Sequence, residues 1–149
     1  MIITRSPLRI SFAGGGTDLP AFYEANDFGC VVSTSITKYV YVTLNHKFDG
    51  KVSVRYSTHE NVDSVKELKH ALIRETLLFY GIEKGVEIVV ASEVPSRGSG
   101  LGASSAMMVA LCLAIEAHKA KYDFKSILDF EVKKTLAEEA AFIEIEKCG

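Results

Sequence analysis

Hydrophobic residues alternate with polar ones through much of the first third of the chain, which is the pattern of half-buried strands. Strands are predicted at residues 2–12, where Pro7 interrupts the alternation, and at residues 31–36, 39–44 and 52–56. Asp49 and Gly50 form a pair that is typical of hairpin turns. These patterns predict an antiparallel sheet in which the last two strands form a hairpin.

Apolar residues follow helical spacing in the second half of the chain. Helices are predicted at residues 65–80, at residues 104–122, and once or twice within residues 124–147. A shorter helix begins at residues 18–20 and ends by Asn26 or Asp27. Residues 57–63 are polar and predict a loop, whereas residues 86–91 are uniformly apolar and predict a fully buried strand.

The composition is that of one globular domain. Of 149 residues, 48% are hydrophobic, which is sufficient for a core without disulfides or metals. No apolar run is long enough to span a membrane, and a net charge of −2 with mixed signs argues against a nucleic-acid partner. Three cysteines without metal-ligand spacing indicate reduced thiols in a cytoplasmic protein. The four histidines are scattered and predict surface or packing roles.

Residues 93–107, EVPSRGSGLGASSAM, place a glycine- and serine-rich loop between a strand and a long helix. The unpaired N–H groups at a helix start, together with the helix dipole, favour a bound anion such as phosphate. Neither common phosphate motif is present, because the residue after Gly102 is Ala103 rather than lysine and the dinucleotide fingerprint lacks its last glycine. Alone, such a loop is equally consistent with a structural turn.

A second glycine-rich stretch, AGGGTD at residues 13–18, follows the first strand. Three consecutive glycines indicate either the close approach of a ligand or a tight turn. Asp18 shortly precedes Pro20 and is suited to cap the short helix.

Together the two stretches resemble the signature of the GHMP family of small-molecule kinases. The first motif corresponds to residues 7–18, PLRISFAGGGTD, and the second to residues 95–106, PSRGSGLGASSA. The resemblance implies an α+β fold, with a mixed, largely antiparallel sheet backed by helices on one side, as in certain ribosomal proteins. The form of the motifs is most similar to that of kinases of D-glycero-D-manno-heptose 7-phosphate, followed by fucokinase-type enzymes.

The resemblance implies an ATP-dependent kinase that phosphorylates the anomeric hydroxyl of a heptose 7-phosphate, or of a related sugar such as fucose or galactose. Arg9 would lie beside the reacting hydroxyl, and a structural salt bridge is its alternative. The sugar would contact Gly16, Thr17 and Asp18. The phosphates of ATP would bind the second motif, at Pro95, Arg97, Gly98, Ser99, Gly100, Leu101, Gly102, Ala103, Ser104 and Ser105. Arg5, Lys38 and Arg55 are unranked candidates for the 7-phosphate.

The resemblance also implies a magnesium ion held by Ser104 and Glu144. A helix N-cap is the alternative role for Ser104. The register of the carboxylate stays open among Glu138, Glu139, Glu144 and Glu146, since most of these acids must be ordinary helix residues.

Members of the family are about twice as long as this chain. The expectation is therefore that residues 1–149 form the N-terminal, ATP-binding domain, without the C-terminal domain and without the catalytic aspartate that follows the magnesium glutamate. Such a chain would be poorly active alone, and would self-associate or bind its missing half. The alternatives are a catalytically inactive domain that binds a ligand or partner, and an RNA-associated domain, which the mild acidity disfavours.

Overall fold

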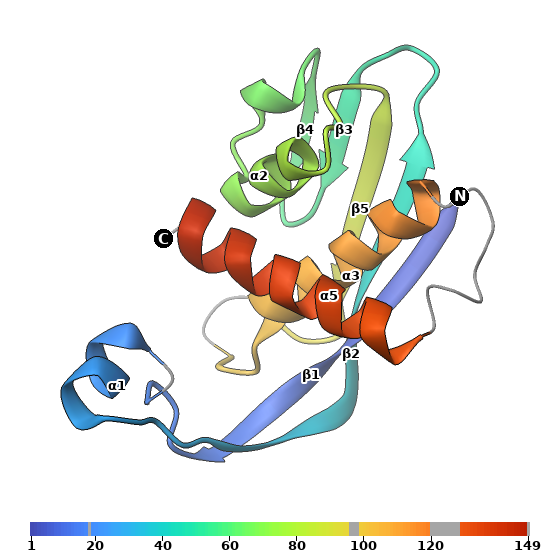
Figure 1. The fold of residues 1–149 in the computed structure, drawn as a ribbon. Coiled ribbons are helices and arrows are strands. Elements are labelled where there is room, and N and C mark those ends of the chain that lie inside the picture. Colours follow the sequence, from blue (N-terminus) through green and yellow to red (C-terminus); the bar gives the residue numbers. More distant parts are fainter. Residues whose placement is uncertain (18, 96–98, 120–128, 149) are drawn as a thin grey trace.

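The computed structural model describes residues 1–17, 19–95, 99–119 and 129–148. One sheet of five strands is covered by helices on one face (Figure 1). Its strands are β1 (Ile2–Ala13), β2 (Val32–His46), β3 (Val52–Arg55), β4 (His59–Val62) and β5 (Val86–Ser92). Its order is β1-β2-β5-β3-β4, and every pairing is antiparallel except that of β3 with β5. The predicted α+β class with a mixed, largely antiparallel sheet is confirmed.

The helices are α1 (Pro20–Asn26), α2 (Ala71–Phe79), α3 (Ala103–Lys119) and α5 (Phe130–Phe142), with a 3-10 turn at Val65–Glu67 and a π-helical end at Ile143–Lys147. The central helix α3 packs on β1 and β2, and α5 crosses over α3 (Figure 1). Ten residues of α3 are buried, as its apolar sequence predicted. On α5, Leu136 and Ala140 face the core, and Ile143 follows them from the π-helical end.

The predicted hairpin between β2 and β3 is wrong. The turn exists, with Gly50 at φ 74°, but β5 lies between the two strands. Gly85 bridges the turn, because Lys47 donates to its carbonyl (2.9 Å) and its own N–H donates to the carbonyl of Gly50 (3.2 Å). In this position, β5 is paired along both edges and its residues Val86 and Ile88 are buried. The residues of the turn alone cannot predict this insertion.

Four other element predictions need correction. Residues 31–36 and 39–44 belong to one continuous strand, β2, and part of the predicted loop 57–63 is strand β4. The predicted helix 65–80 is a 3-10 turn followed by α2, because Leu68 is extended (φ −63°, ψ 133°). Strand β5 is buried on one side only, since the helices cover a single face of the sheet. Among the described residues, no helix is long and apolar enough to cross a membrane.

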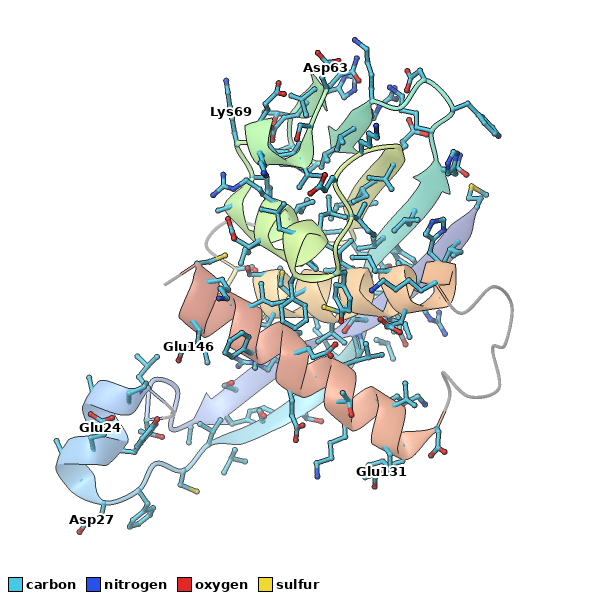
Figure 2. The ribbon with its side chains drawn as sticks, turned by 45° about the horizontal axis from the view of Figure 1, so that its top comes forward. Glu24, Asp27, Asp63, Lys69, Glu131 and Glu146 are labelled. Atoms are coloured by element: carbon cyan, nitrogen blue, oxygen red, sulfur yellow. The ribbon has the colours of Figure 1, made fainter. Side chains whose placement is uncertain are left out.

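The segment from the end of β1 through α1 to the start of β2, residues 10–34, is here called the arm. It extends beyond the helical layer (Figure 1), and none of the residues of α1 is buried. Its acidic side chains Glu24 and Asp27 project from the surface (Figure 2), but so do large apolar groups. Phe12 and Phe28 are 69% and 72% exposed. The arm therefore presents an uncovered apolar surface.

Candidate functional site

The two glycine-rich motifs meet in the structure. Strand β1 carries Arg9 to the loop before α3, where its backbone N–H donates to the carbonyl of Leu101 (3.0 Å). Its side chain lies across Gly102, so that a Cβ at that position would be 3.2 Å from both Cγ and Nε of Arg9. The guanidinium also donates to the hydroxyl of Ser11. The predicted catalytic arginine is thus held at the start of α3, and its exposed side chain has no carboxylate partner among the described residues.

The loop before α3 contains two glycines in the left-handed conformation, Gly100 (φ 66°) and Gly102 (φ 68°). These values permit a sharp entry into the helix that other residues would resist. The first helical hydrogen bond runs from Ala106 to the carbonyl of Gly102 (3.0 Å). The amides of residues 103–105 precede it, as expected of an anion-binding helix start. Pro95 and Ser99 lie in the same loop, whereas Arg97 and Gly98 fall outside the described residues.

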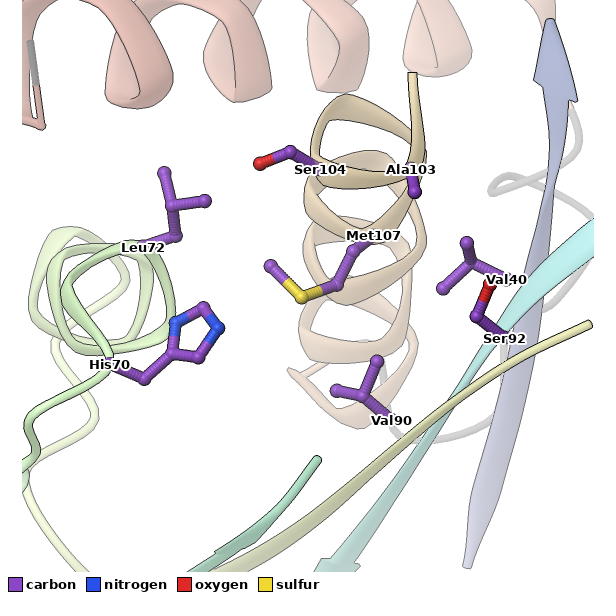
Figure 3. A pocket seen from close by; sticks show the side chains of 8 residues that line it. All are labelled: Val40, His70, Leu72, Val90, Ser92, Ala103, Ser104 and Met107. Carbon is purple, nitrogen blue, oxygen red and sulfur yellow. The ribbon is translucent and has the colours of Figure 1, made fainter. Parts of the chain in front are cut away.

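A small cavity opens on one side of this helix start and reaches Ser104. It has a volume of about 160 Å³. Its walls come from β2, β5, α2 and α3, and are formed by Val40, His70, Leu72, Val90, Ser92, Ala103, Ser104 and Met107 (Figure 3). Most of this lining is apolar. We call this space the α2–α3 cavity.

A larger cavity of about 510 Å³ lies on the other side and reaches Ser105. Its walls are formed by Leu19, Pro20, Ser105, Val109, Ala137, Ala140, Ala141, Glu144 and Ile145. We call it the α3–α5 cavity. It brings together the two residues that directly follow the first motif, a hydroxyl of the second, and Glu144. The structure therefore joins Ser105 with Glu144, while Ser104 lines the opposite cavity.

Glu144 is distinguished from its acidic neighbours by this position. Glu139 accepts a hydrogen bond from the hydroxyl of Tyr80. Glu138 and Glu146 are exposed and line neither cavity, and Figure 2 shows Glu146 at the surface. A carboxylate with a hydroxyl is a hard oxygen set of the kind that magnesium accepts alongside water and phosphate. Within the described residues no group of three His, Cys, Asp or Glu forms a complete metal site, so an ion here would rely on its ligand's oxygens.

Thr17 secures the turn of the first motif. Its hydroxyl donates to the carbonyls of Gly14 (2.8 Å) and Cys30 (3.0 Å), and accepts from the N–H of Cys30 (3.0 Å). The hydroxyl is thus engaged with the backbone at the base of the arm. Gly16 accepts from Leu19 (3.3 Å) in the same turn, and Asp18 falls outside the described residues. The N-cap position of α1 is Leu19 rather than Asp18.

The three cations considered for the sugar phosphate line neither cavity. Arg5 lies over the ring of Tyr39 (4.6 Å), and Lys38 pairs with Glu93 (3.8 Å). Arg55 is exposed at the end of β3. The structure therefore does not gather these three side chains.

His70 is the site residue that sequence reasoning missed. It was expected to be a surface or packing residue, yet it lines the α2–α3 cavity beside Ser104. Burial lowers the pKa of its imidazole below the ordinary value, and the Glu60 carboxylate opposes this shift. The available signal was its place directly before the helical run of residues 71–79, where a side chain can cap the helix.

Comparison with known proteins agrees with the fold. A family model described as the GHMP kinases N terminal domain matches residues 63–148. A D-glycero-alpha-D-manno-heptose 7-phosphate kinase of Campylobacter jejuni is 30% identical over 128 residues, covering 76% of this chain and 36% of that protein.

Two solved structures share the fold across nearly the whole chain. A D-glycero-D-manno-heptose 1-phosphate kinase of Bacteroides thetaiotaomicron has a TM-score of 0.72 at 23% identity, covering 98% of this chain and 49% of that one. The mevalonate kinase of Methanococcus jannaschii has a TM-score of 0.64 at 17% identity, covering 98% and 47%. The chain thus spans about half the length of these structures. It belongs to the GHMP kinase family and corresponds to the N-terminal domain of its members.

Proposed function

We propose that the chain is the nucleotide-binding part of an ATP-dependent sugar kinase, acting on the anomeric hydroxyl of a heptose 7-phosphate or a related sugar. The observation that carries the proposal is the contact of Arg9 with Gly102, which joins the two motifs at the start of α3. The name of the Campylobacter relative supports the heptose substrate.

The phosphates of ATP would lie on the amides at the start of α3. One helix start contributes about 0.3–1 kcal/mol toward a single exposed charge, so several N–H donors must act together. Arg9 adds a fixed cation beside them, as phosphoryl transfer requires where negative charge is spread over the transferred group. Magnesium, when bound, neutralises part of that charge. Glu144 would hold the magnesium ion together with a serine hydroxyl. The resemblance favours Ser104, whereas the cavity shared with Glu144 favours Ser105.

The base of the nucleotide would occupy the α2–α3 cavity. Its volume of about 160 Å³ is below the roughly 300–1,000 Å³ of sites for whole drug-sized ligands, so it suits one ring system. Its apolar walls and its position beside Ser104 fit a base attached to phosphates on the helix start. The sugar would bind on the side of the first motif, near Gly16, Thr17 and Asp18. We expect weak turnover by this chain alone, because the resemblance places the family's general base, an aspartate, outside residues 1–149. A positioned general base contributes about 10²–10⁴-fold to the rate.

A second candidate is a catalytically inactive domain of the same family that binds a ligand or a protein partner. The uncovered apolar surface of the arm favours it, because contiguous exposed apolar patches often mark interaction sites. Sugar turnover with ATP distinguishes the two functions.

Calorimetry with MgATP tests the proposal. We expect the wild-type chain to bind MgATP saturably. Ser104→Ala and Asp18→Ala are compared with it, and Ser57→Ala, which changes an exposed residue of a bend, is the control. Loss of binding in Ser104→Ala but not in Ser57→Ala would support a nucleotide site at α3. If the wild-type chain binds no nucleotide, the proposed function is wrong. Assays with heptose 7-phosphate, fucose and galactose then identify the sugar.

A further inference from the structure

The imidazole of His70 is held in one orientation at the wall of the α2–α3 cavity. Its Nδ1 accepts a hydrogen bond from the N–H of Ile73 (3.4 Å), which caps α2. The ring of Tyr56 packs edge-on against it, with centroids 4.7 Å apart and an interplanar angle of 84°. These two contacts therefore restrict the rotation of the ring.

Glu60 fixes the backbone that carries this ring. Its carboxylate accepts from the N–H groups of Lys69 (2.6 Å) and His70 (3.2 Å), and from the hydroxyl of Tyr56 (2.9 Å). The same acid thus orders both His70 and the tyrosine that packs on it. Strand β4, which carries Glu60, is anchored to the sheet through β3.

The capping bond determines which nitrogen carries the proton. Because Nδ1 accepts from an amide, its lone pair is occupied, and the neutral ring carries its proton on Nε2. None of the hydrogen bonds within the described residues uses Nε2 of His70. Figure 3 shows the ring of His70 turned across the cavity toward Met107. An oriented N–H donor therefore faces a space whose other walls are largely apolar.

We propose that His70 is a base-recognition residue, whose Nε2–H donates a hydrogen bond to a ring nitrogen of the purine of bound ATP. The inference rests on the proposed function, since it requires a nucleotide at the start of α3. A purine presents acceptor nitrogens in the plane of an otherwise apolar ring system. That combination matches one in-plane donor among the side chains of Val90, Leu72 and Met107.

Two substitutions separate this role from the capping role. In His70→Asn, the amide oxygen can replace Nδ1 as the cap of α2, but nothing replaces Nε2. In His70→Gln, the longer side chain can return an N–H to the position of Nε2, but the cap is lost. We expect His70→Asn to weaken MgATP binding about 3- to 10-fold with little change in thermal stability. His70→Gln should bind nearly as the wild type while melting at a lower temperature.

Analogues of ATP identify the acceptor. We expect one of 1-deaza-, 3-deaza- and 7-deaza-ATP, each lacking one ring nitrogen, to bind the wild type several-fold less tightly than ATP. The same analogue should show no such loss with His70→Asn. If MgATP binds the wild type and His70→Asn equally well, base recognition by His70 is wrong while nucleotide binding stands. If the wild type binds no MgATP, the proposed function itself has failed.

Discussion

The side chain of Arg9 lies against Gly102, so that a Cβ there would be 3.2 Å from Cγ and Nε of the arginine and would push the side chain aside by a few tenths of an ångström. Gly102 also has φ 68°, which costs a residue with a Cβ roughly 1–2 kcal/mol. We expect Gly102→Ala to lose about this much stability and, in addition, to displace Arg9 and weaken MgATP binding. Chemical denaturation and calorimetry measure the two effects separately.

Gly50→Ala is the matched control for that prediction. Gly50 has a similar φ of 74°, but no atom lies within 4 Å of the Cβ it would carry. It should lose similar stability and bind MgATP as the wild type does. Equal nucleotide binding by both variants would contradict a role for the Arg9–Gly102 contact.

Glu144→Gln should reduce the magnesium-dependent part of ATP binding. The carboxylate lines the α3–α5 cavity, and removing even indirect partners of a metal costs 10–100-fold in affinity. Titrations with ATP in the presence of magnesium and of EDTA measure the effect. Glu146→Gln changes an exposed acid two positions away and should leave both titrations unchanged. A similar loss in both variants would point to general electrostatics instead.

The buried thiol of Cys112 should make stability fall at alkaline pH. The side chain is fully buried, and this burial raises the pKa of the thiol from its ordinary value of 9.0 to about 11. The folded state therefore favours the protonated thiol, so its contribution is complete below pH 9 and is lost as the pH rises toward 11. The unfolding free energy of Cys112→Ala should fall less steeply over this range. Cys30→Ala, which removes an exposed thiol, should keep the wild-type slope.

Thr17→Val should loosen the arm without unfolding the sheet. The substitution keeps the shape of the side chain but removes three hydrogen bonds, to Gly14 and to both backbone groups of Cys30. Amide hydrogen exchange at Cys30 should accelerate, while exchange in β5 stays slow. Thr34→Val removes only a local contact with Ser35 and serves as the comparison. Unchanged exchange at Cys30 would show that the turn is held by other means.

The apolar surface of the arm should drive self-association at high concentration. Phe28→Ser removes one of its most exposed aromatic side chains and should shift sedimentation toward the monomer. Phe48→Ser removes a more exposed ring, 97% accessible, at a turn outside the arm, and should have no effect. A wild-type chain that stays monomeric throughout the concentration range would contradict the prediction.

The elements with strong local signals were predictable from the sequence, and the pairing of strands was not. Alternation located β1 and most of β2, and the apolar periodicity located α3. The Asp49-Gly50 turn was recognised, but turn chemistry describes four residues and cannot reveal that β5 inserts beside it. Strand β4 was missed because His59, Glu60 and Asn61 are polar. At Glu60, the side chain is used to fix the start of α2 rather than to face water.

The candidate site divides in the same way. The two motifs were identified by their resemblance to a known family, and the contact of Arg9 with Gly102 brings them together in the structure. His70 could not be placed in the site from the sequence, because its role depends on the packing of α2 against α3. That packing brings His70 and Met107, which are 37 positions apart, to the same cavity. No sequence pattern shows that a histidine caps a helix through one ring nitrogen and offers the other to a ligand.

The position of β5 in the middle of the sheet has a consequence for the order of folding. Before residues 86–92 are available, β1 with β2 and β3 with β4 are two separate strand pairs, and isolated pairs are marginal in water. The centre of the sheet therefore closes late, when β5 enters between strands that are already synthesised. Such non-local pairing slows folding, and during translation it leaves the edges of β2 and β3 open until residues 86–92 are available.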